Sequence, residues 1–303
     1  MQIISGTTDF LLQGASAVAI GKFDGMHRGH KALLSEILEA KKRGLQAVVF
    51  TFDPPPAVLF SGKAVKGLTT REEKRRLFRQ IGIDVLIEFP LTFQTAAISP
   101  EDFLRVIVQE QIGAKLVAAG TDLSFGDRGL GDCKLLKARA EAYGYEVKII
   151  DKVLEDGEEI SSTRVRQAVE AGKMQEAARL LGAPYAVMGT VVHGRQLGRT
   201  LGFLTVNLMP PADKLLPPNG VYRSEVECSS GVFKGLTNVG VKPTVEPGDP
   251  PMSVETYIYD FSEDIYDSFI TVRLLTFERP EQKFADVEEL KEQLQRDIAA
   301  GAR

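Results

Sequence analysis

The chain has 303 residues, of which 26% are charged and 44% are hydrophobic, and its formal net charge is −4. This length favours two domains, and the composition is typical of a soluble globular protein. The net negative charge gives no electrostatic reason to expect nucleic acid or an anionic membrane as a partner.

The sequence also lacks the usual signals for export or membrane insertion. No apolar run approaches the roughly 20 residues that span a bilayer, and the first five residues are not typical of a signal peptide. Cys133 and Cys228 are far apart and suggest no disulfide framework. We therefore expect a cytoplasmic protein in a reducing compartment, present as a monomer or a weak oligomer.

In the first half of the chain, short apolar runs alternate with segments of helical periodicity. The apolar runs, which we expect to be strands, cover residues 17–20, 47–52, 84–89, 115–119 and 146–150. The helical patterns between them include residues 31–43, 71–81 and 100–112. This alternation predicts a Rossmann-like α/β domain, in which helices cover both faces of a parallel sheet. Ligands of such sheets bind beyond the carboxyl ends of the strands.

A glycine-bearing turn joins the first run to the first helical pattern, and its sequence is Gly21-Lys22-Phe23-Asp24-Gly25-Met26-His27-Arg28-Gly29-His30. Unpaired backbone N–H groups and the positive end of the helix dipole meet at such a turn, which favours the binding of anions. His27 and His30 are three residues apart and would lie on one face of the opening helical turn. Imidazoles there could donate hydrogen bonds to the oxygens of a phosphate under attack.

Two other roles are open to these histidines, because they could cap the helix or bind zinc. A zinc site needs three or four protein ligands, and the chain has only one other histidine and two distant cysteines. The phosphate interpretation is therefore favoured over the zinc interpretation, and helix capping stays open.

Two later segments of the first half could also contact a ligand. The loop at residues 120–132 contains Asp122 and Phe125 among several glycines, and a plain connection is the alternative. The second segment, Ile160-Ser161-Ser162-Thr163-Arg164, begins a helical pattern. Its hydroxyl groups would cap that helix. Alternatively, the helix end could bind triphosphate oxygens, with Arg164 forming charge-assisted hydrogen bonds.

Helical patterning ends near Gly182, where Ala183 and Pro184 follow, and we place a domain boundary between residues 183 and 184. Beyond it, β-rich runs separated by Gly, Pro and Asn cover residues 187–192, 220–227, 233–239, 254–259 and 269–277. Since no helical pattern lies between these runs, they predict an antiparallel sheet or a small β-barrel. A last helical pattern at residues 286–299 predicts a helix that packs against this barrel.

Three segments of the second half could carry out chemistry, and one of them is the turn-rich loop at residues 238–244. The glycines of residues 189–207 would permit a backbone-lined phosphate loop, and Thr205 and Asn207 would point the same way on an extended chain. Together they could offer oxygen ligands to Mg²⁺, although a hairpin with turn glycines is the alternative. Glu255 places a carboxylate in an otherwise apolar strand. It could be the general base for a primary alcohol, or it could face the solvent.

These motifs together resemble those of a known family, the bacterial bifunctional riboflavin kinase/FMN adenylyltransferases (FAD synthetases). The similar segments occur in the same order as in the family. They are residues 21–30, 51–56, 120–126, 160–166, 189–207, 238–244, 254–256 and 277–284. The resemblance therefore covers nearly the whole chain.

The resemblance implies two reactions with ATP as a substrate. The domain of residues 184–303 would phosphorylate riboflavin to FMN, and the domain of residues 1–183 would adenylylate FMN to FAD and release pyrophosphate. It implies that His27, His30 and Glu255 are catalytic and that Thr205 and Asn207 bind Mg²⁺. The implied flavin-binding residues are Asp122, Phe125, Gly126 and Arg279. The implied nucleotide-binding residues are Gly21, Phe23, Gly25, Ser162, Thr163, Arg164, Gly189, Gly194, Arg195 and Gly198.

At three positions the chain departs from the family pattern. Leu123 replaces an aromatic residue that could stack on a flavin, Leu204 replaces a proline, and Asp267 replaces a glycine, which could alter a turn. Two alternatives stay open. The chain could transfer a nucleotide to another phosphate ester, although its β-rich second half argues against this. Alternatively, only the first domain is an adenylyltransferase, and the second is a flavin-binding or sensing module.

Overall fold

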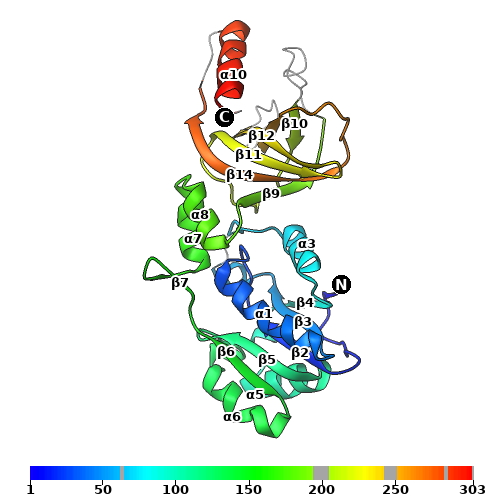
Figure 1. The fold of residues 1–303 in the computed structure, drawn as a ribbon. Helices are drawn as coiled ribbons and strands as arrows, with labels where there is room; N and C mark the ends of the chain where they lie inside the picture. The colour runs from blue at the N-terminus through cyan, green and yellow to red at the C-terminus, as the bar shows by residue number, and fades with distance from the viewer. Residues whose placement is uncertain (62–64, 194–204, 242–250, 283–285, 302–303) are drawn as a thin grey trace. The chain divides into compact units, whose positions relative to one another are not determined.

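The structure is a computed structural model, and it describes residues 1–61, 65–193, 205–241, 251–282 and 286–301. The chain forms two compact units (Figure 1). Unit 1 consists of Met1–Val65 and Thr69–Ser161, and unit 2 consists of Lys66–Leu68 and Ser162–Arg303. Within the described ranges, no helix is both long enough and apolar enough to cross a membrane.

Unit 1 contains a six-stranded parallel sheet with the strand order β1-β4-β3-β2-β5-β6. The five strands predicted from the apolar runs are confirmed as β2 to β6, and β1 adds an edge strand that these runs do not include. The strands are β1 (Gln2–Ser5), β2 (Ser16–Ile20), β3 (Gln46–Asp53), β4 (Val85–Pro90), β5 (Ala114–Gly120) and β6 (Glu146–Ile150).

Helices cover both faces of this sheet, as predicted for an α/β domain (Figure 1). On one face, α1 (Arg28–Lys42) and α3 (Arg71–Ile81) bury apolar side chains against alternate residues of the strands. On the other face, the π-helix η1 (Phe103–Gln111) and α6 (Cys133–Tyr143) do the same. The shorter elements are α2 (Pro56–Ser61), α4 (Phe93–Ala96), α5 (Pro100–Asp102), the 3-10 helix η2 (Asp127–Gly129), β7 (Leu154–Glu155) and β8 (Glu158–Glu159).

Local sequence signals set both ends of α3. The hydroxyl of Thr70 accepts a hydrogen bond from the backbone N–H of Glu73, and the Glu73 carboxylate accepts one from the N–H of Thr70, which forms a capping box. Gly82 ends the helix with a φ of 95°, a left-handed conformation that glycine adopts without strain.

The helix predicted at residues 100–112 is present but is mostly a π-helix. The N–H of Ile112 donates to the carbonyl of Ile107 at 3.0 Å, a spacing of five residues. Phe103, Leu104 and Val108 are buried on one side of it. Apolar periodicity indicates the buried face of such a segment, but it does not distinguish α from π hydrogen bonding.

The sheet of unit 2 is antiparallel and curled, with the strand order β10-β13-β12-β11-β14-β9 (Figure 1). A bridge between Val192 and Asn207 links the chain just after β9 to β10, at the other edge of the sheet. This curled sheet confirms the predicted barrel-like second domain. The strands are β9 (Tyr185–Thr190), β10 (Thr205–Leu208), β11 (Gly220–Cys228), β12 (Gly231–Val241), β13 (Met252–Ile258) and β14 (Phe269–Pro280). The described helices are α7 (Ser162–Glu170), α8 (Met174–Leu181) and α10 (Val287–Gly301).

A buried lysine holds the three-residue segment Lys66–Leu68 in unit 2. Lys214 is 2% exposed, and its ammonium group donates hydrogen bonds to the carbonyls of Leu68 and Ala186, both at 2.8 Å. The hydroxyl of Tyr185 donates to the same Leu68 carbonyl at 3.0 Å. In the structure, unit 1 ends at Ser161 and the main part of unit 2 begins at Ser162. The boundary predicted between residues 183 and 184 concerns the two activities, and it stays a prediction.

Candidate functional site

His27 and His30 lie together where the chain passes from β2 to α1. His27 is the N-cap of α1, and its Nδ1 accepts a hydrogen bond from the backbone N–H of His30 at 3.4 Å. The two rings are stacked, with their centroids 3.7 Å apart. Since Nδ1 of His27 is an acceptor, the neutral ring has its proton on Nε2, which is then a hydrogen-bond donor. His27 therefore caps the helix and also keeps a donor for a ligand.

Burial keeps both imidazoles neutral at pH 7. Desolvation, followed by the positive charge of Lys152, lowers the pKa of His27 to about 4, against opposing effects of two carboxylates. Burial also lowers the pKa of His30 well below its usual value. Nδ1 of His30 is buried and has no hydrogen-bond partner among the described residues. The pair therefore offers polar groups without a positive charge.

We predict that acidification destabilises unit 1 through His27. The unfolded chain takes up a proton on this residue near pH 6.5, whereas the folded chain does so only near pH 4. Between these values the unfolded state binds more protons, so the free energy of unfolding falls as the pH falls. The lowered pKa of His27 corresponds to a change of about 3 kcal/mol in the free energy of unfolding, at about 1.4 kcal/mol for each pKa unit. Urea unfolding followed by circular dichroism measures the free energy of unfolding at pH 7 and at pH 4.5. Between these two pH values this free energy should fall less for H27N than for the wild type. Equal falls in the two proteins would contradict the prediction.

The ring of Phe23 packs against the histidine pair from the protein core. Phe23 is fully buried with a φ of 50°, and its ring centroid lies 5.2 Å from that of His30 and 5.5 Å from that of Phe78 in α3. Gly21 lies against this ring, since a Cβ at that position would be 3.1 Å from it. Gly21 and Phe23 therefore shape the turn, and a direct contact with a nucleotide stays a prediction for both.

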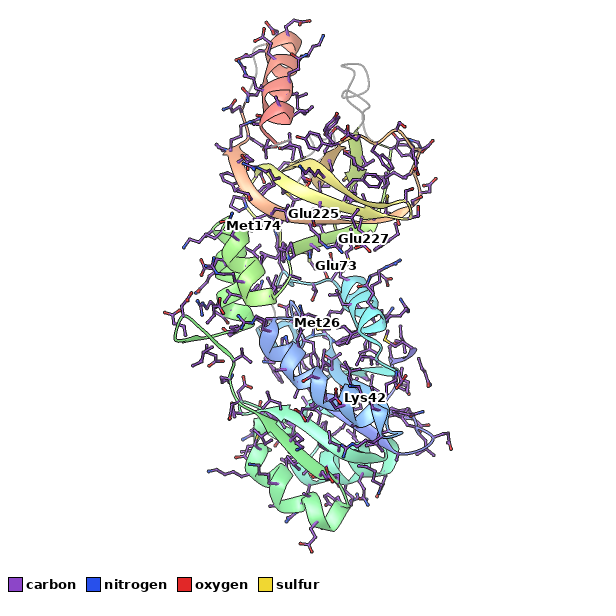
Figure 2. The ribbon with its side chains drawn as sticks, in the orientation of Figure 1. Met26, Lys42, Glu73, Met174, Glu225 and Glu227 are labelled. Atoms are coloured by element: carbon purple, nitrogen blue, oxygen red, sulfur yellow. The ribbon has the colours of Figure 1, made fainter. Side chains whose placement is uncertain are left out.

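The same turn is tied to the start of α3. The N–H of Gly25 donates to the hydroxyl of Thr69, and the N–H of Thr69 donates to Asp24, both at 3.2 Å. Gly25 has a φ of 82°, which suits glycine. Figure 2 labels Met26, in this turn, and Glu73, in the first turn of α3, and both side chains are buried. Gly25 thus fixes the turn, and its contact with a nucleotide also stays a prediction.

Charged residues from the loops after β5 and β6 lie beside the histidines. Lys152 forms ion pairs with Asp122 at 2.7 Å and with Glu159 at 2.6 Å. All three charges act on the pKa of His27, which indicates that they lie near its ring. The structure thus places Asp122 near the histidine pair, and its contact with flavin stays a prediction. No sequence motif singles out Lys152.

Phe125 and Gly126 have structural roles in the glycine-rich loop at residues 120–132. Phe125 is 3% exposed, and its ring packs on Phe103 with centroids 5.1 Å apart. Gly126 has a φ of 71°, and a Cβ there would lie 2.6 Å from the backbone of Pro100, so a larger residue does not fit. Leu123, in place of the family's aromatic residue, packs against the same core. Flavin contacts of Phe125 and Gly126 stay predictions.

Ser162, Thr163 and Arg164 form the first turn of α7, which belongs to unit 2. Two residues before this turn, the carbonyl oxygen of Ile160 lies 3.9 Å from the point where a Cβ on Gly29 would be. Ile160 is therefore close to Gly29 of the histidine motif, and α7 begins two residues after Ile160.

In unit 2, the three residues predicted for phosphoryl transfer come together. β10 pairs with β13 so that Asn207 lies opposite Glu255, and Thr205, two residues earlier, faces the same side. The hydroxyl of Thr205 donates a hydrogen bond to Oε1 of Glu255 at 2.6 Å. Val254 and Thr256 are buried on the opposite face of β13, and Glu255 is half-buried. The carboxylate is thus neither a core residue nor a freely solvated one.

The strand register places further residues in the same row as Glu255 across the sheet. Asn238 of β12 lies opposite Glu255, and the row continues through Val221 of β11 to Arg279 of β14. The guanidinium of Arg279 is bound to Asp297 of α10, with Nε 3.0 Å from Oδ1. Arg279 therefore fastens α10 to the sheet, and its predicted contact with flavin is not tested by this pairing. Asn238 begins the segment 238–244 that the sequence analysis singled out without giving Asn238 a role, and the register places it in this row.

The donor atoms around Glu255 fit the predicted Mg²⁺. The hydroxyl of Thr205, the amide oxygen of Asn207 and the carboxylate of Glu255 are oxygen ligands, which this cation prefers. Among the described residues, no group of three or more His, Cys, Asp or Glu side chains is arranged to hold a metal ion. Gly189 lies in β9, whereas Gly194, Arg195, Gly198 and Leu204 are outside the described residues.

Asp267 has a backbone conformation that glycine adopts without strain. Its φ is 58°, in the left-handed region, and its N–H donates to the carbonyl of Val191 at 3.0 Å. Aspartate is among the residues that tolerate this region. At this departure from the family pattern, the chain thus has a left-handed turn that aspartate occupies.

Comparisons with known proteins match both halves of the chain. The FAD synthetase family model matches residues 11–164, and the riboflavin kinase family model matches residues 181–303. A bifunctional riboflavin kinase/FMN adenylyltransferase of Listeria monocytogenes is 37% identical over 96% of this chain and 93% of its own. One of Escherichia coli (strain K12) is 37% identical over 94% and 91%. A crystal structure described as a macrolide-efflux protein from Streptococcus pneumoniae is similar with a TM-score of 0.82, 31% identity, and coverage of 97% and 96%.

Proposed function

Because the chain belongs to the family of bacterial bifunctional riboflavin kinase/FMN adenylyltransferases, we propose that it carries out two successive reactions of FAD synthesis. Residues 184–303 transfer the γ-phosphate of ATP to the 5′-hydroxyl of riboflavin and give FMN. Residues 1–183 then join FMN to the AMP part of a second ATP, which gives FAD and releases pyrophosphate. The observation that best supports this proposal is the presence of a suitable polar site in each unit, the stacked histidines in one and the Thr205–Glu255 pair in the other.

In the adenylyl transfer, an oxygen of the FMN phosphate attacks the α-phosphate of ATP, and the bond to pyrophosphate breaks. Negative charge develops on the equatorial oxygens of that phosphate. The Nε2–H of His27 and the imidazole of His30 donate hydrogen bonds to these oxygens. Neither ring has to give up a proton, which suits two neutral imidazoles. The first turn of α7, with Ser162, Thr163 and Arg164, binds the leaving pyrophosphate.

The two loops of unit 1 are assigned to different parts of the substrates. The turn before α1 accommodates the nucleotide, and the residues assigned to it are Gly21, Phe23 and Gly25. The loop after β5 borders the flavin, and the residues assigned to it are Asp122, Phe125 and Gly126. In both loops the glycines allow the backbone to come close to a ligand or to a neighbouring segment.

In the phosphoryl transfer, the 5′-hydroxyl oxygen of riboflavin attacks the γ-phosphate of ATP, Glu255 accepts the proton of that hydroxyl, and the bond to the leaving ADP breaks. The hydroxyl of Thr205 orients the carboxylate through the 2.6 Å hydrogen bond. Thr205 and Asn207 would hold Mg²⁺, which when bound neutralises phosphate charge. Arg279 is assigned to the flavin, and the residues assigned to ATP in this unit are Gly189, Gly194, Arg195 and Gly198.

We further propose that the protein works in the cytoplasm as a monomer or a weak oligomer, on riboflavin, FMN and ATP, without nucleic acid or membrane partners. Its net charge of −4 supports the absence of nucleic acid, and its two cysteines, both free thiols in the structure, are compatible with a reducing compartment.

A single assay tests the proposed pair of activities. The purified chain with riboflavin, Mg²⁺ and ATP is expected to yield both FMN and FAD, separated by chromatography. A parallel reaction with FMN in place of riboflavin should yield FAD directly. Formation of FAD from FMN without any FMN from riboflavin would contradict the bifunctional proposal, and it would favour a flavin-binding or sensing role for the second domain.

A further inference from the structure

Lys74 lies on the face of α3 that packs against the histidine turn. It is one helical turn before Phe78, so the two side chains share a face. Phe78 packs edge-on against Phe23, with centroids 5.5 Å apart, and Phe23 packs against His30. The hydrogen bonds of Thr69 to the turn fix the start of the same helix. Contacts at both ends thus align this face of α3 with the turn that holds the histidines.

The arginines on either side of Lys74 are already paired. Arg71 and Arg75 both bind Glu88, with guanidinium-to-carboxylate distances of 2.6–2.9 Å, and Glu88 is 4% exposed. Arg71 also lies 3.1 Å from Asp53. These pairs satisfy the two arginines through charge-assisted hydrogen bonds at the carboxyl ends of β3 and β4. Their positive charges are therefore committed to the protein itself.

Lys74 differs from these arginines. Its side chain is half-buried, and in the described part of the chain its ammonium group makes no hydrogen bond or ion pair. Burial lowers its pKa, against the opposing charges of Asp24, Glu88 and Asp53. Its own charge contributes to the low pKa of His30, which places it near that ring. Lys74 is therefore an unpaired cation beside the histidine pair.

The chemistry of the site calls for such a cation. His27 and His30 are neutral at pH 7, so they supply hydrogen bonds but no positive charge. Arg28 and Lys152, two other basic residues near this site, are paired with carboxylates. A triphosphate and a phosphate monoester together bring several negative charges to one place. Their mutual repulsion has to be offset before the two phosphates can react.

We propose that Lys74 binds a phosphate group of the adenylylation substrates next to His27 and His30. This inference rests on the FMN adenylylation proposed above. The ammonium group would donate hydrogen bonds to phosphate oxygens as a mobile point charge, which the paired guanidinium groups of Arg71 and Arg75 do not provide. The phosphate is that of FMN or one of those of ATP, and the chemistry of the contact is the same for both.

The test compares three variants of the full chain in two assays. K74M removes the charge, K74R keeps it, and R79M removes a charge from an exposed position of the same helix. For K74M we expect kcat/KM for FMN adenylylation to fall by about 10²-fold, as when one donor to a developing charge is lost. K74R should recover most of this loss, and R79M should match the wild type. Riboflavin phosphorylation should be unchanged in all three.

The kinetic constants then identify the phosphate. A higher KM for ATP indicates the triphosphate, and a higher KM for FMN indicates the monoester. A lower kcat with both KM values unchanged indicates a contact made only in the transition state. All three results support the proposal.

Two results would overturn it. One is K74M with FMN adenylylation within threefold of the wild type. The other is an equal loss of both activities accompanied by a lower melting temperature, because that pattern indicates a structural role. The wild-type reaction is measured first, so a chain that makes no FAD from FMN refutes the proposed function rather than the role of Lys74.

Discussion

Replacing Glu255 with glutamine is expected to lower kcat for riboflavin phosphorylation by about 10²- to 10⁴-fold, the usual contribution of a general base. Glutamine has the same shape, and its amide oxygen can still accept the 2.6 Å hydrogen bond of Thr205. It cannot take the proton of the 5′-hydroxyl. The loss should therefore appear in phosphorylation, while FMN adenylylation by the same protein stays within twofold of the wild type.

The matched control for this variant is E225Q. Glu225, labelled in Figure 2, lies on β11 of the same sheet, so the control makes the same change in charge elsewhere in unit 2. Both variants are assayed for FMN formation from riboflavin and for FAD formation from FMN. If E255Q phosphorylates riboflavin within threefold of the wild type, Glu255 is not the base. If flavin binding is retained and phosphorylation is lost, the flavin-sensing alternative fails.

Replacing His27 with asparagine is expected to lower kcat for FMN adenylylation by about 10²- to 10³-fold, the usual effect of removing one preorganised donor from a developing charge. Asparagine is a favoured N-cap residue, so it should preserve the start of α1 that Nδ1 of His27 now caps. The shorter amide cannot place a donor where Nε2 lies. H27N thus separates the catalytic role of His27 from its structural one.

His193 supplies the control for H27N. It is the third histidine of the chain, and its ring stacks on Tyr266 in unit 2. H193N should leave FMN adenylylation unchanged, and H27N should leave riboflavin phosphorylation unchanged. An adenylylation rate for H27N within threefold of the wild type would remove His27 from the mechanism. A parallel loss of helical circular dichroism would instead mean that the cap is the residue's main role.

The sequence predicts the sheet of unit 1 well because its strands are buried on both faces. Continuous apolar runs mark β2 to β5, and the runs alternate with amphipathic helices. β1 has only four residues and lies at the edge, with both ends exposed, so it gives no comparable signal. The π hydrogen bonds of η1 are likewise invisible to periodicity, because its apolar residues follow a helical pattern in either case.

For the candidate sites, the sequence predicts the proximity of residues that are close in the chain better than that of distant residues. His27 and His30 are close in sequence, so helical geometry alone places them together. Thr205 and Glu255 are 50 residues apart, and only the strand register shows that one donates a hydrogen bond to the other. Aromatic residues in glycine-rich turns are ambiguous, and the structure buries Phe23 in the core beneath the site.

The ion pairs of the charged residues around the histidines could not be predicted from the sequence. Lys152 reaches the site from the loop after β6, and its partners Asp122 and Glu159 lie 30 and 7 residues away in sequence. Whether a lysine is paired or unpaired depends on such tertiary contacts. The sequence therefore does not distinguish the paired Lys152 from the unpaired Lys74.

The short segment held by Lys214 means that no single cut in the chain separates the two units completely. A protease or a gene fission that divided the protein near residue 161 or residue 183 would leave Lys66–Leu68 on the amino-terminal fragment. If the two fragments separated, the carbonyl of Leu68 would lose its hydrogen bonds from Lys214 and Tyr185, and a buried ammonium group would lose one of its acceptors. Two separately encoded halves would each need compensating substitutions at these positions, which favours keeping both activities on one polypeptide.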